Sequence, residues 1–155
     1  MLTVWADCQL VTLYNWKLHP RLLAYVDRIW GPHTVDSFAD GLNHQINMYN
    51  SLYWDPWTAG VDALAQQNWG SENNFVNLPF ILIPQIWDTI VHLRATTTII
   101  APWWPVQAFY ARLQELSISS PIKLPTYPGI IPSCHHTPEP LETNGASMPG
   151  GYLEI

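Results

Sequence analysis

The sequence predicts a small three-layer α/β domain with a mostly parallel sheet, and three observations lead to this prediction. Segments with apolar residues at helical spacing alternate with short, β-branched runs. Alternation of this kind favours crossover helices between parallel strands. The chain has 155 residues, 48% of them hydrophobic, which is enough for one domain with its own core.

Three segments have the pattern of amphipathic helices. Residues 20–30 open with Pro20, which suits a first helical turn, and are followed by Gly31, a common helix stop. The apolar residues of this segment recur at helical spacing and are Leu22, Leu23, Val26, Ile29 and Trp30. Residues 81–93 and 106–116 show the same spacing, so we expect helices over all three ranges.

Three other segments are typical of buried strands. The run TTTIIA at 96–101 is the clearest, because it is β-branched and ends before Pro102. Residues 33–36 and 74–77 are shorter, and each ends in a polar residue, Asp36 and Asn77. We expect the three strands to lie near one another, with Asp36 and Asn77 facing the crevice at their carboxyl ends.

The composition divides the chain into three parts. Residues 1–18 have no clear period and are predicted to be an entry segment, followed by the α/β domain over 19–116. Residues 117–155 contain seven prolines and four glycines without an apolar period. We interpret them as a tail or linker and expect poor order after about residue 125.

Charge and aromatic content limit the function classes. The net charge is −6, from 6 Lys+Arg and 12 Asp+Glu, which argues against a free-standing nucleic-acid binder with a basic face. Nine tryptophans in a chain with only 12% charged residues predict aromatic platforms or a surface that packs on another molecule. No apolar stretch is long enough to span a membrane.

The two cysteines, Cys8 and Cys134, lie too far apart to suggest a disulfide framework. Free thiols indicate a reducing compartment, so we expect an intracellular protein, cytoplasmic or nuclear. Cys134-His135-His136 offers some metal ligands, but a closed site needs about four and no others lie near in sequence. We therefore expect no metal.

Two short blocks are candidates for binding a nucleoside. The first is Asp36-Ser37-Phe38-Ala39 with Asn43. Its carboxylate can accept a hydroxyl or amino hydrogen, and its small residues let the backbone approach a ligand. On pattern alone, an aspartate at a strand end is more often a helix cap or turn former.

The second block is Asn77-Leu78-Pro79-Phe80. It combines an amide, a rigid turn and an aromatic ring, which are groups that recognise an extruded base. An ordinary strand-to-helix turn with Phe80 in the core is the alternative, and it is favoured when the block is taken alone.

Two weaker candidates have ordinary structural alternatives. Asp62-Ala63-Leu64, with Trp69 nearby, is either a binding-site rim or a surface aspartate beside core residues. The run 102–105, Pro-Trp-Trp-Pro, is either a wall of the ligand crevice or, more simply, a lid over the core.

The joint order of four blocks resembles a known family. The blocks are WKLHPRLLAYVDRIWGPHTVDSFADGLN, WDPWTAGVDALAQQNW, NNFVNLPFILIPQIWDTI and ATTTIIAPWWPVQAFYARLQEL. Together they resemble the Dam-like DNA adenine methyltransferase region of DIRS-type (tyrosine-recombinase) retroelement polyproteins. They are also similar to phage-type DNA adenine methyltransferases. The resemblance covers residues 14 to 125.

This resemblance implies a Rossmann-like sandwich of the methyltransferase type with S-adenosylmethionine as cofactor. It implies that the partner is DNA, which would be bound through neighbouring domains of the polyprotein. It implies neither a membrane partner nor a metal. Residues matching the block that forms the methyl-donor pocket and its rim are Asp36, Phe38, Ala39, Asn43 and Asp62.

The catalytic motif of the family, Asn/Asp-Pro-Pro-Tyr/Phe, is matched by Asn77, Pro79 and Phe80, whereas Leu78 stands where the family has proline. The implied reaction is methyl transfer to the exocyclic amine of adenine, driven by positioning and by acceptors for the developing charge. Because of Leu78 and the acidic charge, we expect a degenerate domain. The alternatives are a non-catalytic spacer or interaction domain, or a decayed fragment of a reverse transcriptase/RNase H polyprotein.

Overall fold

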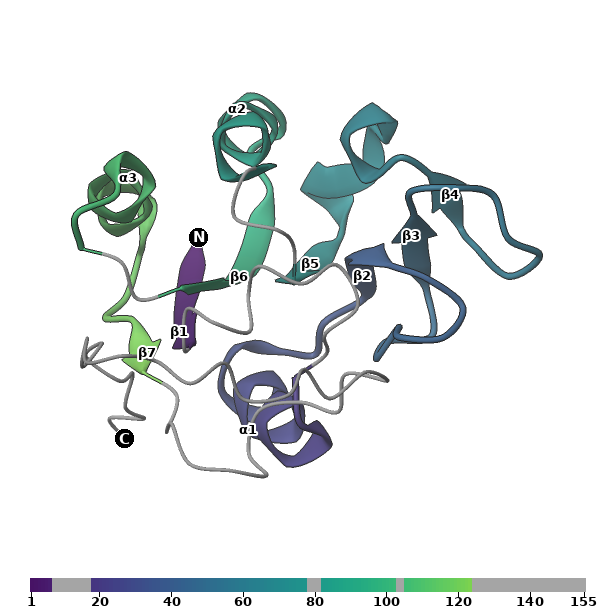
Figure 1. The fold of residues 1–155 in the computed structure, drawn as a ribbon, viewed down its shortest axis with the longest axis horizontal. Coiled ribbons are helices and arrows are strands. Elements are labelled where there is room, and N and C mark those ends of the chain that lie inside the picture. The colour runs from purple at the N-terminus through teal and green to yellow at the C-terminus, as the bar shows by residue number, and fades with distance from the viewer. Residues whose placement is uncertain (7–17, 78–81, 103–104, 124–155) are drawn as a thin grey trace, which may run out of the picture.

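The chain folds into a three-layer α/β sandwich around a parallel sheet (Figure 1). The computed structural model describes residues 1–6, 18–77, 82–102 and 105–123. Helices α2 (Ile83–Leu93) and α3 (Ala108–Leu116) cover one face of the sheet, and α1 (Pro20–Trp30) covers the other. The predicted fold class, a Rossmann-like three-layer sandwich, is confirmed.

Within the described residues, the sheet has seven strands in the order β4-β3-β2-β5-β6-β1-β7, and all of their pairings are parallel. Its strands, in chain order, are β1 (Leu2–Ala6), β2 (Val35–Ala39), β3 (Tyr49–Ser51), β4 (Gly60–Val61), β5 (Asn73–Asn77), β6 (Thr96–Pro102) and β7 (Ile122–Lys123). Strands β2, β5 and β6 are adjacent and correspond to the three predicted strands, so their expected proximity is confirmed.

Two strands lie outside the range predicted for the domain, 19–116. Strand β1 pairs with β6 over Leu2–Ala6, and β7 pairs with β1 through Ile122 and Lys123. The sheet therefore begins inside the predicted entry segment and continues into the predicted tail. The residues expected to be poorly ordered, after about 125, lie outside the described part of the chain.

Helix α1 has the boundaries that the sequence predicts. The side chain of His19 caps its start by accepting from Arg21 N at 3.2 Å, and Gly31 N–H donates to Asp27 O at its end. A Cβ atom at Gly31 would lie 2.2 Å from Asp27 O, so only glycine fits there. The helix buries Leu22 and Val26 in a cluster completed by Leu18, Phe75 and Ile100.

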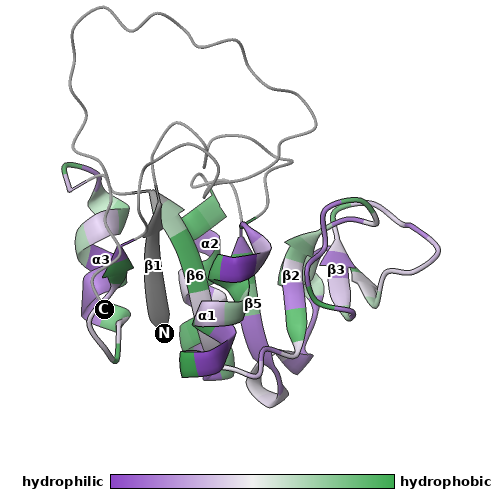
Figure 2. Cartoon of the chain, turned by 90° about the horizontal axis from the view of Figure 1, so that it is seen from below, coloured by the Kyte–Doolittle hydropathy of each residue, from purple (hydrophilic) through white to green (hydrophobic). Residues whose placement is uncertain are grey.

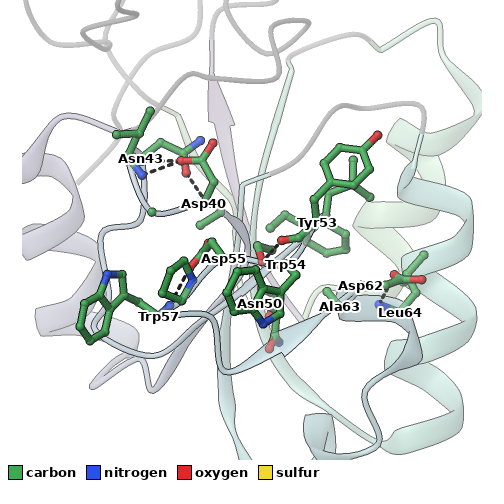
Figure 3. A pocket seen from close by; sticks show the side chains of 18 of the residues that line it. Asp40, Asn43, Asn50, Tyr53, Trp54, Asp55, Trp57, Asp62, Ala63 and Leu64 are labelled. Atoms are coloured by element: carbon green, nitrogen blue, oxygen red, sulfur yellow. Dashed lines mark hydrogen bonds between the residues drawn. The ribbon is translucent and has the colours of Figure 1, made fainter.

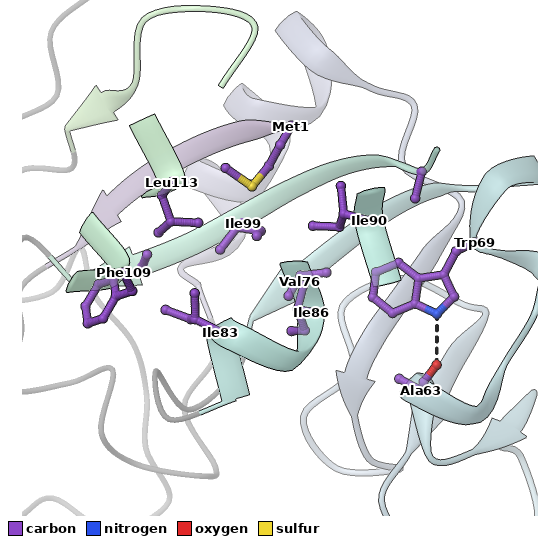
Figure 4. Close-up of a cluster of buried hydrophobic side chains, with 12 residues drawn as sticks. Met1, Ala63, Trp69, Val76, Ile83, Ile86, Ile90, Ile99, Phe109 and Leu113 are labelled. Carbon is purple, nitrogen blue, oxygen red and sulfur yellow. Dashed lines mark hydrogen bonds between the residues drawn. The ribbon is translucent and has the colours of Figure 1, made fainter. Parts of the chain in front are cut away.

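The larger core cluster fills the space between the opposite face of the sheet and helices α2 and α3 (Figure 4). Ile83, Ile86 and Ile90 of α2 lie in it, as the predicted helical spacing requires. Trp69, only 1% exposed, packs in the same cluster and donates its indole N–H to Ala63 O at 2.8 Å. This bond satisfies the polar atom of a buried tryptophan.

Strand β5 opens with two asparagines and is hydrophilic there, whereas β6 contains a hydrophobic stretch at residues 99–101 (Figure 2). Asn74 is 1% exposed, but its amide donates to the carbonyls of Trp69 and Thr96 at 2.9 Å each. A buried amide with such partners costs little. Asn74 thereby ties the connection before β5 to the sheet.

Candidate functional site

The sheet contains a topological switch point between β2 and β5. From β2 the chain proceeds outward to β3 and β4, then returns to β5 on the other side of β2. In parallel sheets, ligands bind outside the carboxyl ends of the strands at such a point. A cavity of about 670 Å³ lies there (Figure 3).

Three connections supply most of the cavity wall. They follow β2, β3 and β4 and contribute residues 40–43, 52–57 and 62–64. Residues 37–39 and 50–51 add the ends of β2 and β3, and Leu82 adds a wall from the start of α2. The wall therefore comes from segments that are distant in sequence and adjacent in the sheet.

The first connection is closed by two polar side chains that bond each other's backbone. Asp40 Oδ1 accepts from the N–H groups of Leu42 and Asn43 at 2.8 Å each. Asn43 Oδ1 accepts in turn from Asp40 N at 2.7 Å. The connection is thus a compact turn that holds both side chains at the cavity.

The second connection is anchored by Asp55. Its Oδ1 accepts from the hydroxyl of Tyr49 at 2.6 Å and from Trp57 N at 2.9 Å. The hydrogen bond from Tyr49 is the main cause that lowers the pKa of Asp55, so this carboxylate is charged near neutrality. Burial and the adjacent Asp55 raise the pKa of Tyr49 to about 12.

Several of the large apolar side chains that line this cavity are unusually exposed to solvent. Tyr53, Trp54 and Trp57 are 79%, 74% and 81% exposed, and all three line the cavity. Leu42 and Leu52 also line it and are exposed. These five are half of the ten large hydrophobic side chains that are exposed within the described residues.

The third connection begins with a strained residue. Asp62 adopts a φ of 56°, a left-handed conformation that residues other than glycine rarely adopt. Its Oδ1 accepts from Leu64 N at 3.1 Å and so caps the short 3-10 helix over Ala63–Ala65. Backbone strain of this kind is common at binding sites. Capping a short helix, however, is by itself a structural role.

The structure brings together four of the five residues predicted for the methyl-donor pocket. Those that line the cavity are Phe38, Ala39, Asn43 and Asp62. Asp36 does not line it. The predicted strand ended at Asp36, whereas β2 continues to Ala39, so Asp36 is the second residue of the strand rather than its end.

Asp36 is buried on the side of the sheet that faces α1. It pairs in register with Phe75 of the α1 cluster, and its Oδ2 accepts from Gln45 N at 3.0 Å. Burial is the main cause that raises the pKa of Asp36 to about 7, with a smaller contribution from Asp40. The backbone N–H groups of Gln45 and Phe38 act in the opposite direction.

Asn77, the first residue of the predicted catalytic motif, ends strand β5. It pairs with Ile100 of β6 and lies at the same edge of the sheet as the cavity, on the strand next to β2. It is not among the residues lining the cavity. Leu78, Pro79 and Phe80 lie outside the described residues, so the arrangement of the motif stays a prediction.

Sequence reasoning missed the polar end of β3. Asn50 is 6% exposed and lines the cavity, and Ser51 Oγ donates to Tyr53 O at 2.5 Å. A strand of three residues carries no periodic signal, so its end was not recognisable. The abundance of tryptophan was the signal for the exposed rings, but it did not indicate which tryptophans they were.

The charged residues among the described lining of the cavity are all acidic. Asp40, Asp55 and Asp62 line it, whereas none of the described lining residues is lysine, arginine or histidine. An anionic cavity favours ligands with cationic or hydrogen-donating groups and opposes phosphates.

Metal-binding clusters and membrane-spanning helices are both absent from the described ranges. No group of three or more His, Cys, Asp or Glu residues there is placed to hold a metal ion. None of the helices described is long and apolar enough to cross a membrane. Cys134-His135-His136 and the tryptophans at 103–104 fall outside these ranges.

Comparisons of the chain with protein-family models, with curated proteins and with solved structures found no match.

Proposed function

We propose that the cavity binds S-adenosylmethionine and that the chain is a retroelement-derived, DNA adenine methyltransferase-like domain with weak activity on its own. One observation carries this proposal. Phe38, Ala39, Asn43 and Asp62, which the sequence resemblance assigns to the donor pocket, line a single cavity at the switch point of the sheet. They come from two strand ends that are separated in sequence.

The cavity suits this cofactor in size and in chemistry. Its volume of about 670 Å³ is typical of small-molecule sites. Phe38 and Leu82 offer apolar contact, whereas the Asn50 amide and the Asp62 carboxylate can accept hydrogens from amino and hydroxyl groups. Its carboxylates complement a sulfonium and an ammonium group, and the cofactor has no phosphate that they would repel.

When bound, S-adenosylmethionine supplies an electrophilic methyl group. The contribution of this chain is binding and orientation. Asn77, at the end of β5, is the residue proposed to accept a hydrogen bond from the adenine amine and hold it toward the cavity. Because the cavity lacks basic lining residues among those described, the grip on DNA is assigned to neighbouring domains of the polyprotein.

A second candidate function is a non-catalytic interaction domain. Leu78 in place of the motif proline and the exposed aromatic residues favour it. The two candidates differ in one measurable property, since only the first requires binding of S-adenosylmethionine.

Calorimetric titration of the full chain with S-adenosylmethionine and with its demethylated product tests the proposal. We expect binding of both, and an Asp62→Asn variant should bind about tenfold more weakly, because it loses a charge but keeps an oxygen to cap Leu64. Asp88→Asn, an equivalent change at an exposed position of α2, is the control and should bind as the wild type does. Absence of heat at millimolar ligand would reject the cofactor and leave the interaction domain.

A further inference from the structure

Three aromatic side chains form what we name the aromatic rim: Tyr53, Trp54 and Trp57, all in the connection after β3 (Figure 3). Each is more than 70% exposed. In Figure 3, Trp57 and Tyr53 lie on different sides of the cavity, with Asp55 and Asn50 between them in this view. Clustered exposed rings of this size mark an interaction site rather than ordinary surface.

The connection that carries the rim is anchored by hydrogen bonds of the Asp55 and Thr58 side chains. Asp55 accepts from Tyr49 OH and from Trp57 N, which ties the middle of the connection to β3. Thr58 Oγ1 accepts from Ser51 N at 3.2 Å and donates to Gly60 O at 2.7 Å, which ties its end to β3 and β4. The rings therefore stand exposed on an anchored connection, so a partner would meet them with little loss of backbone entropy.

The charges around the rim indicate the chemistry of the partner. Asp40, Asp55 and Asp62 line the same cavity, no lysine, arginine or histidine is found among its described lining residues, and the chain carries a net charge of −6. Exposed rings next to carboxylates attract cations, because the ring faces and the carboxylates are both negative. Polyphosphate backbones would be repelled.

We propose that the aromatic rim binds an extended, arginine-bearing segment of another protein. Guanidinium groups stack on tryptophan and tyrosine faces and form paired hydrogen bonds with carboxylates, which an ammonium group cannot do in the same geometry. An extended segment can present successive arginines to rings that lie on different sides of the cavity. This proposal does not require methyl transfer, but the rim lines the same cavity as the proposed cofactor site, so bound S-adenosylmethionine should compete with the segment.

The test is fluorescence anisotropy with the full chain and short labelled peptides that alternate glycine with arginine, lysine or glutamate. We expect the arginine peptide to bind most tightly, the lysine peptide at least about threefold more weakly and the glutamate peptide undetectably. Binding of the arginine peptide should weaken as salt rises. Equal affinity for the arginine and glutamate peptides, or no binding of either, would overturn the proposal.

Variants locate the binding surface. Trp54→Ala and Trp57→Ala should each weaken binding of the arginine peptide about threefold to tenfold. Val106→Ala is the control, since Val106 is 94% exposed, precedes α3 in the chain and is not among the residues lining the cavity. Thermal unfolding should confirm that all three variants fold. Equal affinities of the rim variants and the control would reject the rim as the site.

Two other occupants are outcomes of the same experiment. Tighter binding of a labelled oligothymidine than of the arginine peptide would identify a single-stranded nucleic-acid site and contradict the proposal. Sedimentation that shows self-association of the wild type, abolished by Trp57→Ala, would instead assign the rim to a second copy of the chain.

Discussion

A buried carboxyl group within β2 links the stability of the fold to pH. Asp36 is 3% exposed, and burial raises its pKa from 3.8 to about 7. The folded state therefore binds this proton more tightly than the unfolded state does. As pH rises from about 4 to 7, the contribution of Asp36 to stability decreases, and above pH 7 the full cost of burying the charge is present.

We therefore expect Asp36→Asn to stabilise the protein at pH 8 by about 1–3 kcal/mol and to have little effect near pH 4. The asparagine oxygen can still accept from Gln45 N, while the buried charge is removed. Urea unfolding at both pH values measures the difference, with Asp88→Asn as the exposed control. A variant less stable than the wild type at pH 8 would show that the charge of Asp36 is needed by the fold.

The same residue shows why the candidate site was only partly predictable. The acidic side chain and the small residues after it indicated that a strand ends near Asp36, at the edge of the sheet where the cavity lies. The exact end was not encoded in the pattern, because Val35–Ala39 mixes polar and apolar residues without strict alternation. Because β2 ends three residues later than predicted, Asp36 lies in the interior and not at the cavity, whereas Phe38, Ala39 and Asn43 line the cavity.

At the scale of elements, α1 is joined to β6 by a buried histidine. His33 Nδ1 lies 2.7 Å from Asp27 Oδ1, and His33 Nε2 lies 2.9 Å from Thr98 Oγ1. Burial lowers the pKa of His33 despite the opposing effect of Asp27. Although burial acts to raise the pKa of Asp27, its bonds from His33 outweigh that effect and lower it. A neutral imidazole bonded to a charged carboxylate is consistent with the direction of both pKa shifts.

His33→Ala should therefore destabilise the protein by about 2–4 kcal/mol at pH 8, because it opens a cavity and leaves Thr98 without this partner. Since the folded pKa of His33 lies below 6.5, the wild type should also lose stability as pH falls below 6.5, and the variant should lose less. Chemical unfolding across this range measures both effects. The exposed His92→Ala is the control, and an equal loss in it would contradict the role of His33.

Elements differ in how far the sequence predicts them. Helix α1 and the central strands β2, β5 and β6 were recognisable as elements, because α1 shows a helical period and the strands contain β-branched or apolar residues, although the end of β2 was missed by three residues. Strands β3, β4 and β7 have only two or three residues and cannot show one. These segments form strands because their backbone groups pair with the free edge of the neighbouring strand. That edge exists only in the assembled sheet, so a local sequence pattern does not reveal it.

At the scale of the whole molecule, the distribution of charge opposes action on DNA by this chain alone. Extrusion of a base costs a few kcal/mol, which methyltransferases offset with cationic contacts to phosphates. Six basic residues against twelve acidic ones cannot form a broad cationic groove, and the described cavity wall contains three aspartates. The largest deficit of the proposed enzyme is therefore in capture of the nucleic acid.

The motif adds a smaller deficit at Leu78. Proline at this place would fix φ near −65° and pre-set the turn, whereas leucine restores freedom that typically costs ~0.4–1 kcal/mol.

We expect no useful transfer of labelled methyl groups to single- or double-stranded DNA by the unmodified chain. Fusion to a basic DNA-binding domain should restore transfer if capture limits the reaction, and Leu78→Pro alone should restore it if the turn does. Because the capture deficit is the larger in free energy, we expect transfer in the fusion and more in the fusion with Leu78→Pro. Robust transfer by the unmodified chain would show that its acidic surface is no obstacle to DNA.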